Sequence, residues 1–158
     1  MKKFEFTGET KTISLLFRTA TLHRIRAVAE FGLVKIGDLG GWIEKEENLS
    51  HEGKAWVWGN AKVCGDAEVC GDAKVFSASH VLVIGAIGSR DDFTTFFRDK
   101  DNEITVKCGC FLGKIDKFLE KVTQTHGDSK YALVYRAAVE VARLQIDLSG
   151  EAPKDADE

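Results

Sequence analysis

A six-residue repeat in the middle of the chain limits its possible folds more than any other feature of the sequence. Four consecutive hexads fill residues 56–79, each with a valine at one position and a small residue four places later. The repeated residues are Val57, Val63, Val69 and Val75, with Ala61, Ala67, Ala73 and Ser79. A helix would need apolar spacings of three and four, and an isolated hairpin would not repeat its turn every six residues. The repeat therefore predicts short strands and tight corners, with the valines directed into a narrow interior.

Such hexads are typical of a parallel β-helix, in which three hexads close one triangular coil. We expect a mainly β fold with some α-helix, in which residues 49–87 form about two coils. Because the ends of so short a stack need caps, residues 1–48 are predicted to be antiparallel strands that cap it. Residues 88–148 are predicted to form a β-hairpin and two helices. Residues 149–158 are acidic and poor in apolar side chains, which predicts a disordered tail on one compact unit.

The two helices are expected at about Lys114–Thr125 and Ser129–Leu148, from apolar residues spaced three and four apart. The second helix has a broader apolar stripe than one packing surface needs. Most of the stripe should cover the sheet and the first helix. The remainder is suited to a symmetric homodimer through the C-terminal helices.

Charge and hydropathy exclude several classes of protein. The chain has 158 residues and a formal net charge of −3, which argues against a nucleic-acid partner held by bulk electrostatics. No apolar run approaches the roughly 18 residues of a membrane span, and the first residues lack the apolar core of a signal peptide. We therefore expect a cytoplasmic protein with no membrane partner and with its four cysteines reduced.

Several motifs give the chain a family resemblance. They are the Val-x-Gly-Asp-Ala repeats, Gly37–Ile43, Gly88–Arg90, Cys108–Phe111 and Thr125–Gly127. The repeat core resembles the left-handed β-helix hexapeptide proteins, and residues 1–148 resemble phage and prophage proteins described as polymer-forming cytoskeletal proteins. The resemblance implies a left-handed hand for the β-helix and, for a phage-encoded chain, the host cytoplasm. Because no catalytic constellation stands out in the sequence, we expect a non-enzymatic phage or prophage binding or assembly module. The association with phage proteins suggests inhibition of a host factor as one form of that role.

The most suggestive site lies where the repeats end. Ser89, Arg90, Thr94 and Thr95 bring a guanidinium and hydroxyls to one turn, which is suited to a phosphate or carboxylate. We place His126 in the same predicted site for a ligand or partner. The alternative role for this turn is to cap the open edge of the β-helix. The partner is therefore expected to be a protein or a small anionic ligand, and the alternative function is a small-molecule or nucleotide binder.

Catalytic and metal sites are less well supported. Acyltransferases with this repeat use a histidine between coils, for which His51 and His80 are the candidates, but two coils offer little groove for their substrate. Cys108 and Cys110 would need two further ligands to hold a metal, and Cys110 could be a nucleophile only with His126 beside it. A hexapeptide acyltransferase is therefore a remote alternative, and we predict no catalytic residue, no metal and no cofactor.

Overall fold

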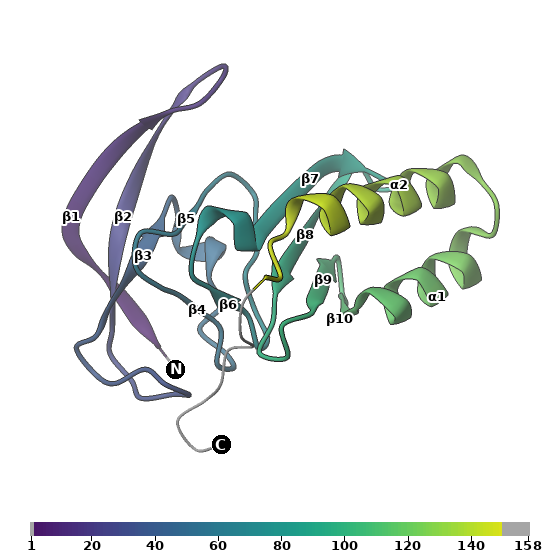
Figure 1. The fold of residues 1–158 in the computed structure, drawn as a ribbon. Coiled ribbons are helices and arrows are strands. Elements are labelled where there is room, and N and C mark those ends of the chain that lie inside the picture. The colour runs from purple at the N-terminus through teal and green to yellow at the C-terminus, as the bar shows by residue number, and fades with distance from the viewer. Residues whose placement is uncertain (1, 150–158) are drawn as a thin grey trace.

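Two four-stranded sheets, a pair of short parallel strands and two helices build the chain in the computed structural model, which describes residues 2–149 (Figure 1). The strands before the C-terminal sheet are β1 (Phe4–Ser14), β2 (Thr19–Ala27), β3 (Leu39–Ile43), β4 (Trp56–Val57), β5 (Lys62–Val63) and β6 (Lys74–Val75). The remaining strands and the helices are β7 (Val81–Ile87), β8 (Asp92–Arg98), β9 (Ile104–Cys108), β10 (Phe111–Lys114), α1 (Ile115–His126) and α2 (Lys130–Gln145). Most of the predicted tail, from residue 150 on, lies outside the described residues.

The N-terminal sheet is built on a long hairpin. Strands β1, β2 and β3 are antiparallel, as predicted, and β5 joins β3 in parallel. The hairpin extends away from the rest of the molecule (Figure 1), and its turn is closed by the Leu15 N–H, which donates to the Arg18 carbonyl at 2.7 Å. Leu16 and Phe17 form the tip of the turn, where 88% and 93% of each residue is exposed.

The repeat residues face the interior as their pattern predicts. The four valines and the three alanines of the hexads are all buried. Strands β4 and β6 lie in parallel, with Val57 opposite Val75. The valines and alanines of the pattern are thus buried as predicted, while Ser79 is half-buried and Trp56 and Lys74 are buried outside the pattern.

The predicted fold class, a short left-handed parallel β-helix, is nevertheless wrong. Parallel pairing in the described residues is confined to β4–β6, β3–β5 and one bridge from Leu49 to Val69. The larger sheets are mixed or antiparallel, and β7, predicted to continue the repeat, pairs antiparallel with β8. The hexad pattern ends at a 3-10 turn, Ala78–His80. In this turn His80 Nδ1 accepts hydrogen bonds from the backbone N–H groups of Phe76 and Ser77. The spacing of the inward-facing residues specifies which face of a strand is buried. It does not specify which other strand pairs with it.

The C-terminal part contains an antiparallel sheet in the order β10–β9–β8–β7, with α1 and α2 packed against it. The predicted hairpin is confirmed as β8–β9, and both predicted helices are present. Helix α2 ends at Gln145, three residues before the predicted end.

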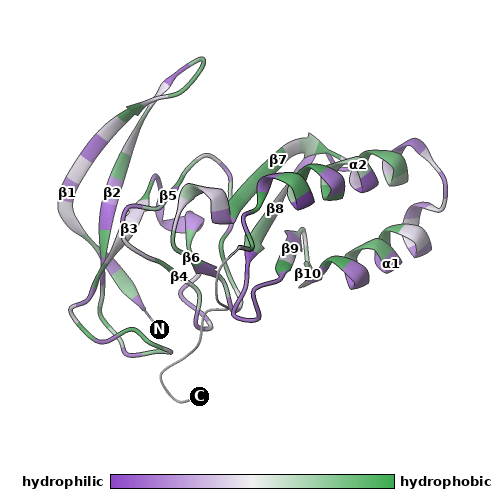
Figure 2. Cartoon of the chain, in the orientation of Figure 1, coloured by the Kyte–Doolittle hydropathy of each residue, from purple (hydrophilic) through white to green (hydrophobic). Residues whose placement is uncertain are grey.

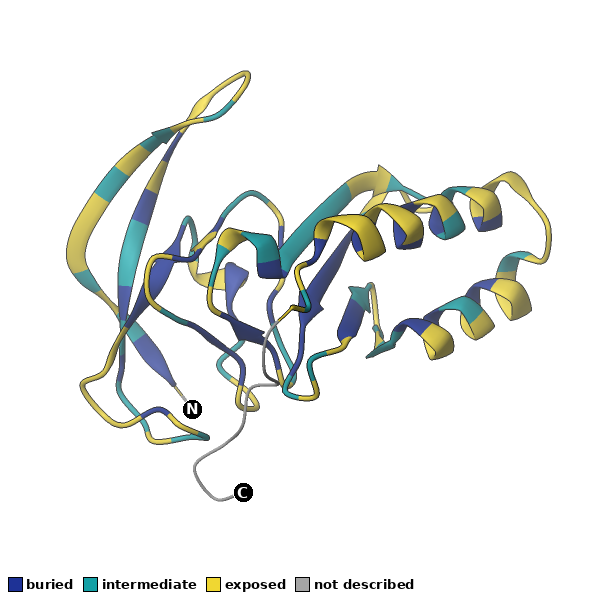
Figure 3. Cartoon of the chain, viewed as in Figure 1, coloured by how far each residue is buried: buried dark blue, intermediate teal, exposed yellow. Residues whose placement is uncertain are grey.

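Two hydrophobic cores meet at β8, a strand that is buried over most of its length (Figure 3). Phe97 belongs to the first core, which contains the repeat valines and the N-terminal sheet. Phe96 belongs to the second core, between the C-terminal sheet and the helices. Successive side chains of a strand point to opposite faces. The adjacent residues Phe96 and Phe97 of β8 therefore pack in different cores.

Part of α2 stays uncovered. Leu133, Val141 and Leu144 are exposed on this helix, along which apolar and polar positions alternate (Figure 2). The homodimer expected through the C-terminal helices stays a prediction. No helix within residues 2–149 is long and apolar enough to cross a membrane.

Candidate functional site

A cleft of about 270 Å³ lies between the helices and one end of the C-terminal sheet. Its lining comes from α1, α2, the β7–β8 turn and the β9–β10 turn. The lining residues are Ser89, Arg90, Asp92, Cys108, Gly109, Cys110, Phe111, Phe118, Lys121, Val122, Thr125, His126 and Tyr135. The fold thus brings together three of the five residues predicted to form a site, namely Ser89, Arg90 and His126.

The β7–β8 turn reaches the cleft because a glycine lets it lie against α2. Gly88 has a φ of 81°, in the region that favours glycine. A Cβ atom at this position would lie 1.9 Å from the Tyr135 hydroxyl oxygen. The close approach of backbone and phenol fixes the turn, and Ser89 and Arg90 follow at the rim of the cleft.

Aromatic rings form much of the cleft floor. The rings of Phe118 and Tyr135 meet edge to face at a centroid distance of 5.6 Å. Phe111 packs on Phe118 at 5.5 Å, and the His126 imidazole stacks on Tyr135 at 5.8 Å with 24° between the planes. Such interlocked rings hold their positions well, so the floor is a preformed apolar surface.

The rim of the cleft has more positive than negative charge. Arg90 and Lys121 are exposed, and within residues 2–149 neither side chain forms a hydrogen bond or an ion pair. Asp92 is the one carboxylate of the lining, and its Oδ1 accepts the Phe93 backbone N–H at 2.7 Å. Two cations therefore remain available at the rim for an anion.

The inner wall holds a phenol and a thiol in contact. Burial, reinforced by the charge of Cys108 and a hydrogen bond to it, raises the pKa of Tyr135 to about 12. The phenol therefore stays protonated at neutral pH and remains a hydrogen-bond donor. The Thr94 hydroxyl also donates to Cys108 Sγ, at 3.3 Å.

The other two residues of the predicted site, Thr94 and Thr95, are not in the cleft. Each is only 1% exposed, and they point to opposite faces of β8. Thr95 Oγ1 accepts the Glu68 backbone N–H at 2.9 Å, which joins β8 to the repeat segment. Their hydroxyls are therefore engaged inside the protein.

The site also contains residues that the sequence analysis did not assign to it. Phe118, Lys121 and Thr125 lie on α1, and Tyr135 lies on α2. Residues 118, 121, 122 and 125 have the spacing of one helix face, which is the sequence signal that could have grouped them. Nothing in the sequence indicates that this face meets the β7–β8 turn.

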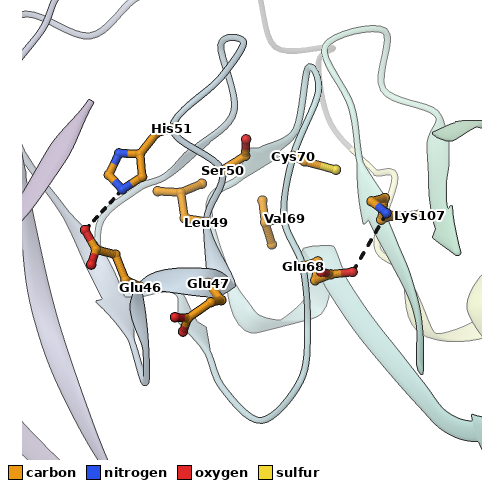
Figure 4. Close-up of a pocket in the computed structure, with 9 residues that line it drawn as sticks. All are labelled: Glu46, Glu47, Leu49, Ser50, His51, Glu68, Val69, Cys70 and Lys107. Carbon is orange, nitrogen blue, oxygen red and sulfur yellow. Dashed lines mark hydrogen bonds and ion pairs between the residues drawn. The ribbon is translucent and has the colours of Figure 1, made fainter. Parts of the chain in front are cut away.

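A second pocket, of about 540 Å³, lies beside the repeat segment (Figure 4). Two pairs of its polar side chains lie close together: His51 Nε2 is 3.2 Å from Glu46 Oε1, and Lys107 Nζ is 3.9 Å from Glu68 Oε2. His51 Nδ1 accepts the Lys3 backbone N–H at 3.0 Å, and its ring stacks on Phe4. Both nitrogens of this acyltransferase candidate are thus engaged structurally.

The structure adds little support to the hypotheses of acyl transfer through His80, nucleophilic catalysis by Cys110 and metal binding. The second acyltransferase candidate, His80, holds the 3-10 turn described above. Cys110 and His126 line the same cleft, yet no hydrogen bond joins them among the described residues. Within that part of the chain, no group of three or more His, Cys, Asp or Glu side chains could hold a metal ion.

Comparison with known proteins adds no identity to this geometry. No protein-family model matches the chain, and no curated protein matches it. The phage-family resemblance drawn from the motifs therefore stays a prediction.

Proposed function

We propose that the chain binds a small organic anion in the cleft between the helices and the C-terminal sheet. The observation that carries this proposal is the pair of unpaired cations, Arg90 and Lys121, at the rim of a preformed aromatic floor. An anionic group would bind at the rim, while a flat or apolar group would pack on the rings below it.

The cations suit an oxyanion in particular. A guanidinium offers two parallel N–H donors to a carboxylate or phosphate, and hydrogen bonds to charged groups are among the strong ones. The Ser89 and Thr125 hydroxyls lie in the same lining and add neutral donors. This grouping supports phosphate or carboxylate as the recognised group.

The size of the cleft limits the ligand. Its volume of about 270 Å³ is just below the usual range of about 300–1,000 Å³ for sites of drug-sized molecules. A nucleoside monophosphate or an aromatic carboxylate matches such a space, whereas a dinucleotide would extend outside it. Nucleoside monophosphates therefore serve as the first probes.

Calorimetric titration with adenosine monophosphate and with adenosine tests the role of charge. We expect saturable binding of the nucleotide and at least tenfold weaker binding of adenosine, because a charged hydrogen bond contributes about 1.5–3 kcal/mol. Arg90→Gln and Lys121→Gln should each weaken nucleotide binding by about tenfold. Lys117→Gln, on α1 outside the cleft lining, is the matched control and should bind as the wild type does.

Two results would overturn the proposal. One is equal affinity of wild type and Arg90→Gln for the nucleotide. The other is the absence of saturable binding by nucleoside monophosphates and by benzoate at millimolar concentration.

The partner-binding role expected from the sequence is supported by a different feature, the tip of the β1–β2 hairpin. Leu16 and Phe17 occupy the centre of a turn, where Gly, Asn, Asp or Pro are usual. Arg18 anchors the turn through two hydrogen bonds to the Glu44 carboxylate, at 2.7 and 3.0 Å. An exposed apolar tip of this kind fits an apolar pocket on a partner protein.

Affinity capture from a cell lysate tests this second role when it compares three baits. The wild type and Leu144→Ser, which removes an equally exposed leucine elsewhere, should retain the same protein. A Leu16→Ser/Phe17→Ser variant should lose it. Retention of the same proteins by all three baits would exclude the tip as the binding element.

A further inference from the structure

We propose that Cys108 and Cys110 form a reactive dithiol that reduces a hydroperoxide and becomes a disulfide. The two thiols line one cleft, on either side of Gly109 in the β9–β10 turn. This reactivity requires only the two cysteines and their neighbours, so it is independent of anion binding.

Cys108 is the sulfur that attacks the peroxide. Its Sγ accepts a hydrogen bond from the Thr94 hydroxyl at 3.3 Å, and the Tyr135 hydroxyl also donates to it. Thr94 is buried, so water does not compete for its hydroxyl. The Thr94 hydroxyl thus holds the Cys108 sulfur at the wall of the cleft, where a peroxide can reach it.

Cys110 is placed to resolve the oxidised sulfur. Cys108 is the last residue of β9 and pairs with Phe111, so Gly109 and Cys110 make the two-residue turn between them. Gly109 has a φ of 58°, which gives the turn a conformation natural to glycine. Cys108 is half-buried and Cys110 is exposed, so the attacked sulfur is reached through the cleft.

The other two cysteines are internal controls. Cys64 and Cys70 lie in the repeat segment, and burial raises the pKa of both thiols. A protonated thiol reacts slowly with peroxide. Selectivity for the cleft pair is therefore part of the proposal.

The reaction proceeds in two balanced steps. The Cys108 thiolate attacks one peroxide oxygen: an S–O bond forms, the O–O bond breaks, and the alkoxide or hydroxide that leaves takes up a proton. Cys108 is now a sulfenic acid, oxidised by two electrons, and the hydroperoxide has been reduced to an alcohol or water. The Cys110 thiol then gives up its proton and its sulfur attacks the Cys108 sulfur. The S–S bond forms, the S–O bond breaks, and the hydroxide that leaves takes up the proton from Cys110 as water.

Mass spectrometry of the full chain after hydrogen peroxide treatment and alkylation tests the proposal. Cleavage at lysine separates the two pairs of cysteines, because residues 108–114 contain one pair and residues 63–74 contain the other. We expect the first peptide to lose two hydrogens and resist alkylation, while the second remains fully alkylated. In Cys110→Ser, dimedone should trap a sulfenic acid at Cys108.

Variants at Thr94 test whether its hydrogen bond to the Cys108 sulfur contributes to the reaction. Thr94→Val keeps the shape but removes the donor, and it should slow oxidation of Cys108 by about threefold or more. Thr94→Ser should restore the rate. Circular dichroism before oxidation shows that each variant is folded.

Three outcomes would overturn the proposal: faster oxidation of residues 63–74, no disulfide within residues 108–114, or equal rates for Thr94→Val and wild type. Because the assay contains no anionic ligand, its failure leaves the binding test of the cleft unaffected. Failure of the binding test likewise leaves the dithiol chemistry intact.

Discussion

Single residues decide how closely the parts of this molecule approach one another, and Gly88 is the clearest case. The Tyr135 hydroxyl occupies the space that a side chain at Gly88 would need, and the backbone there is left-handed. Gly88→Ala should therefore lower the free energy of unfolding by roughly 1–3 kcal/mol, through overpacking and strain. Chemical denaturation measures this loss.

The Tyr135→Phe background provides the control for Gly88→Ala. Phenylalanine removes the hydroxyl oxygen nearest to the added methyl group, so Gly88→Ala should cost less in this background. An equal loss in both backgrounds would mean that the hydroxyl oxygen does not contribute, and that the ring carbons of residue 135 and backbone strain account for the effect.

A buried lysine gives the protein a pH dependence on the alkaline side. Lys3 is 3% exposed, and its Nζ donates to the Ala55 carbonyl at 2.6 Å. Burial lowers the pKa of Lys3 from 10.5 to about 8, although the nearby Cys70 opposes the shift. The unfolded chain then binds this proton more tightly than the folded chain, so the Lys3 contribution to stability rises between pH 8 and 10.5.

Urea unfolding of wild type and Lys3→Met across this pH window measures the effect. The difference between the two free energies should change in favour of the wild type with rising pH, by at most about 3 kcal/mol. Because Cys70 interacts with Lys3, both proteins are compared in a Cys70→Ser background. Titration of the other cysteines and of the tyrosines is then common to both proteins and cancels. Parallel curves would show that the Lys3 amine titrates as it does in water.

At the scale of elements, the hexads show how far periodicity can predict a fold. The valine and alanine positions follow from the sequence because each hexad directs the same two side chains inward. The sheet partners do not follow, because the antiparallel pairing of β7 with β8 depends on residues far from the repeat. The same limit applies to the cleft. The β7–β8 turn can be predicted from the sequence, but its contact with α1 and α2 depends on tertiary packing.

Three adjacent substitutions test the inward and outward positions of the repeat. Ala67→Leu should cost roughly 1–3 kcal/mol, because the buried corner has no room for added methylenes. Val69→Asp should cost more, since it places an unpaired charge in the first core. Glu68→Gln, at an exposed position between them, should remain within about 0.5 kcal/mol of wild type.

Denaturation midpoints of these three variants provide the comparison. The expected order of stability is Glu68→Gln, then Ala67→Leu, then Val69→Asp. A Glu68 variant as unstable as the Val69 variant would contradict the burial pattern of the hexads.

At the scale of the whole molecule, β8 makes the two cores depend on one strand. Phe97 and Phe96 are both fully buried, one in each core. If β8 loses its packing on one face, the residues packed against its other face also become less stable. The two cores should therefore unfold together, although they contain different parts of the chain.

Two spectroscopic probes can follow the cores separately. All three tryptophans, Trp42, Trp56 and Trp58, precede β8, whereas both α-helices follow it. Phe97→Ala, a first-core change, should lower stability by roughly 3–5 kcal/mol. It should shift the transitions seen by tryptophan fluorescence and by helical circular dichroism equally. Separate midpoints for the two probes would show that β8 does not couple the cores.

The division between the cores also has a consequence for protein synthesis. Every fully buried residue of the first core lies within positions 4–97, and every fully buried residue of the second within positions 96–146. A chain emerging from the ribosome N-terminus first can thus close the first core before the helices have been translated. The cleft, which needs Tyr135 from the last helix, is then the final part of the protein to be completed.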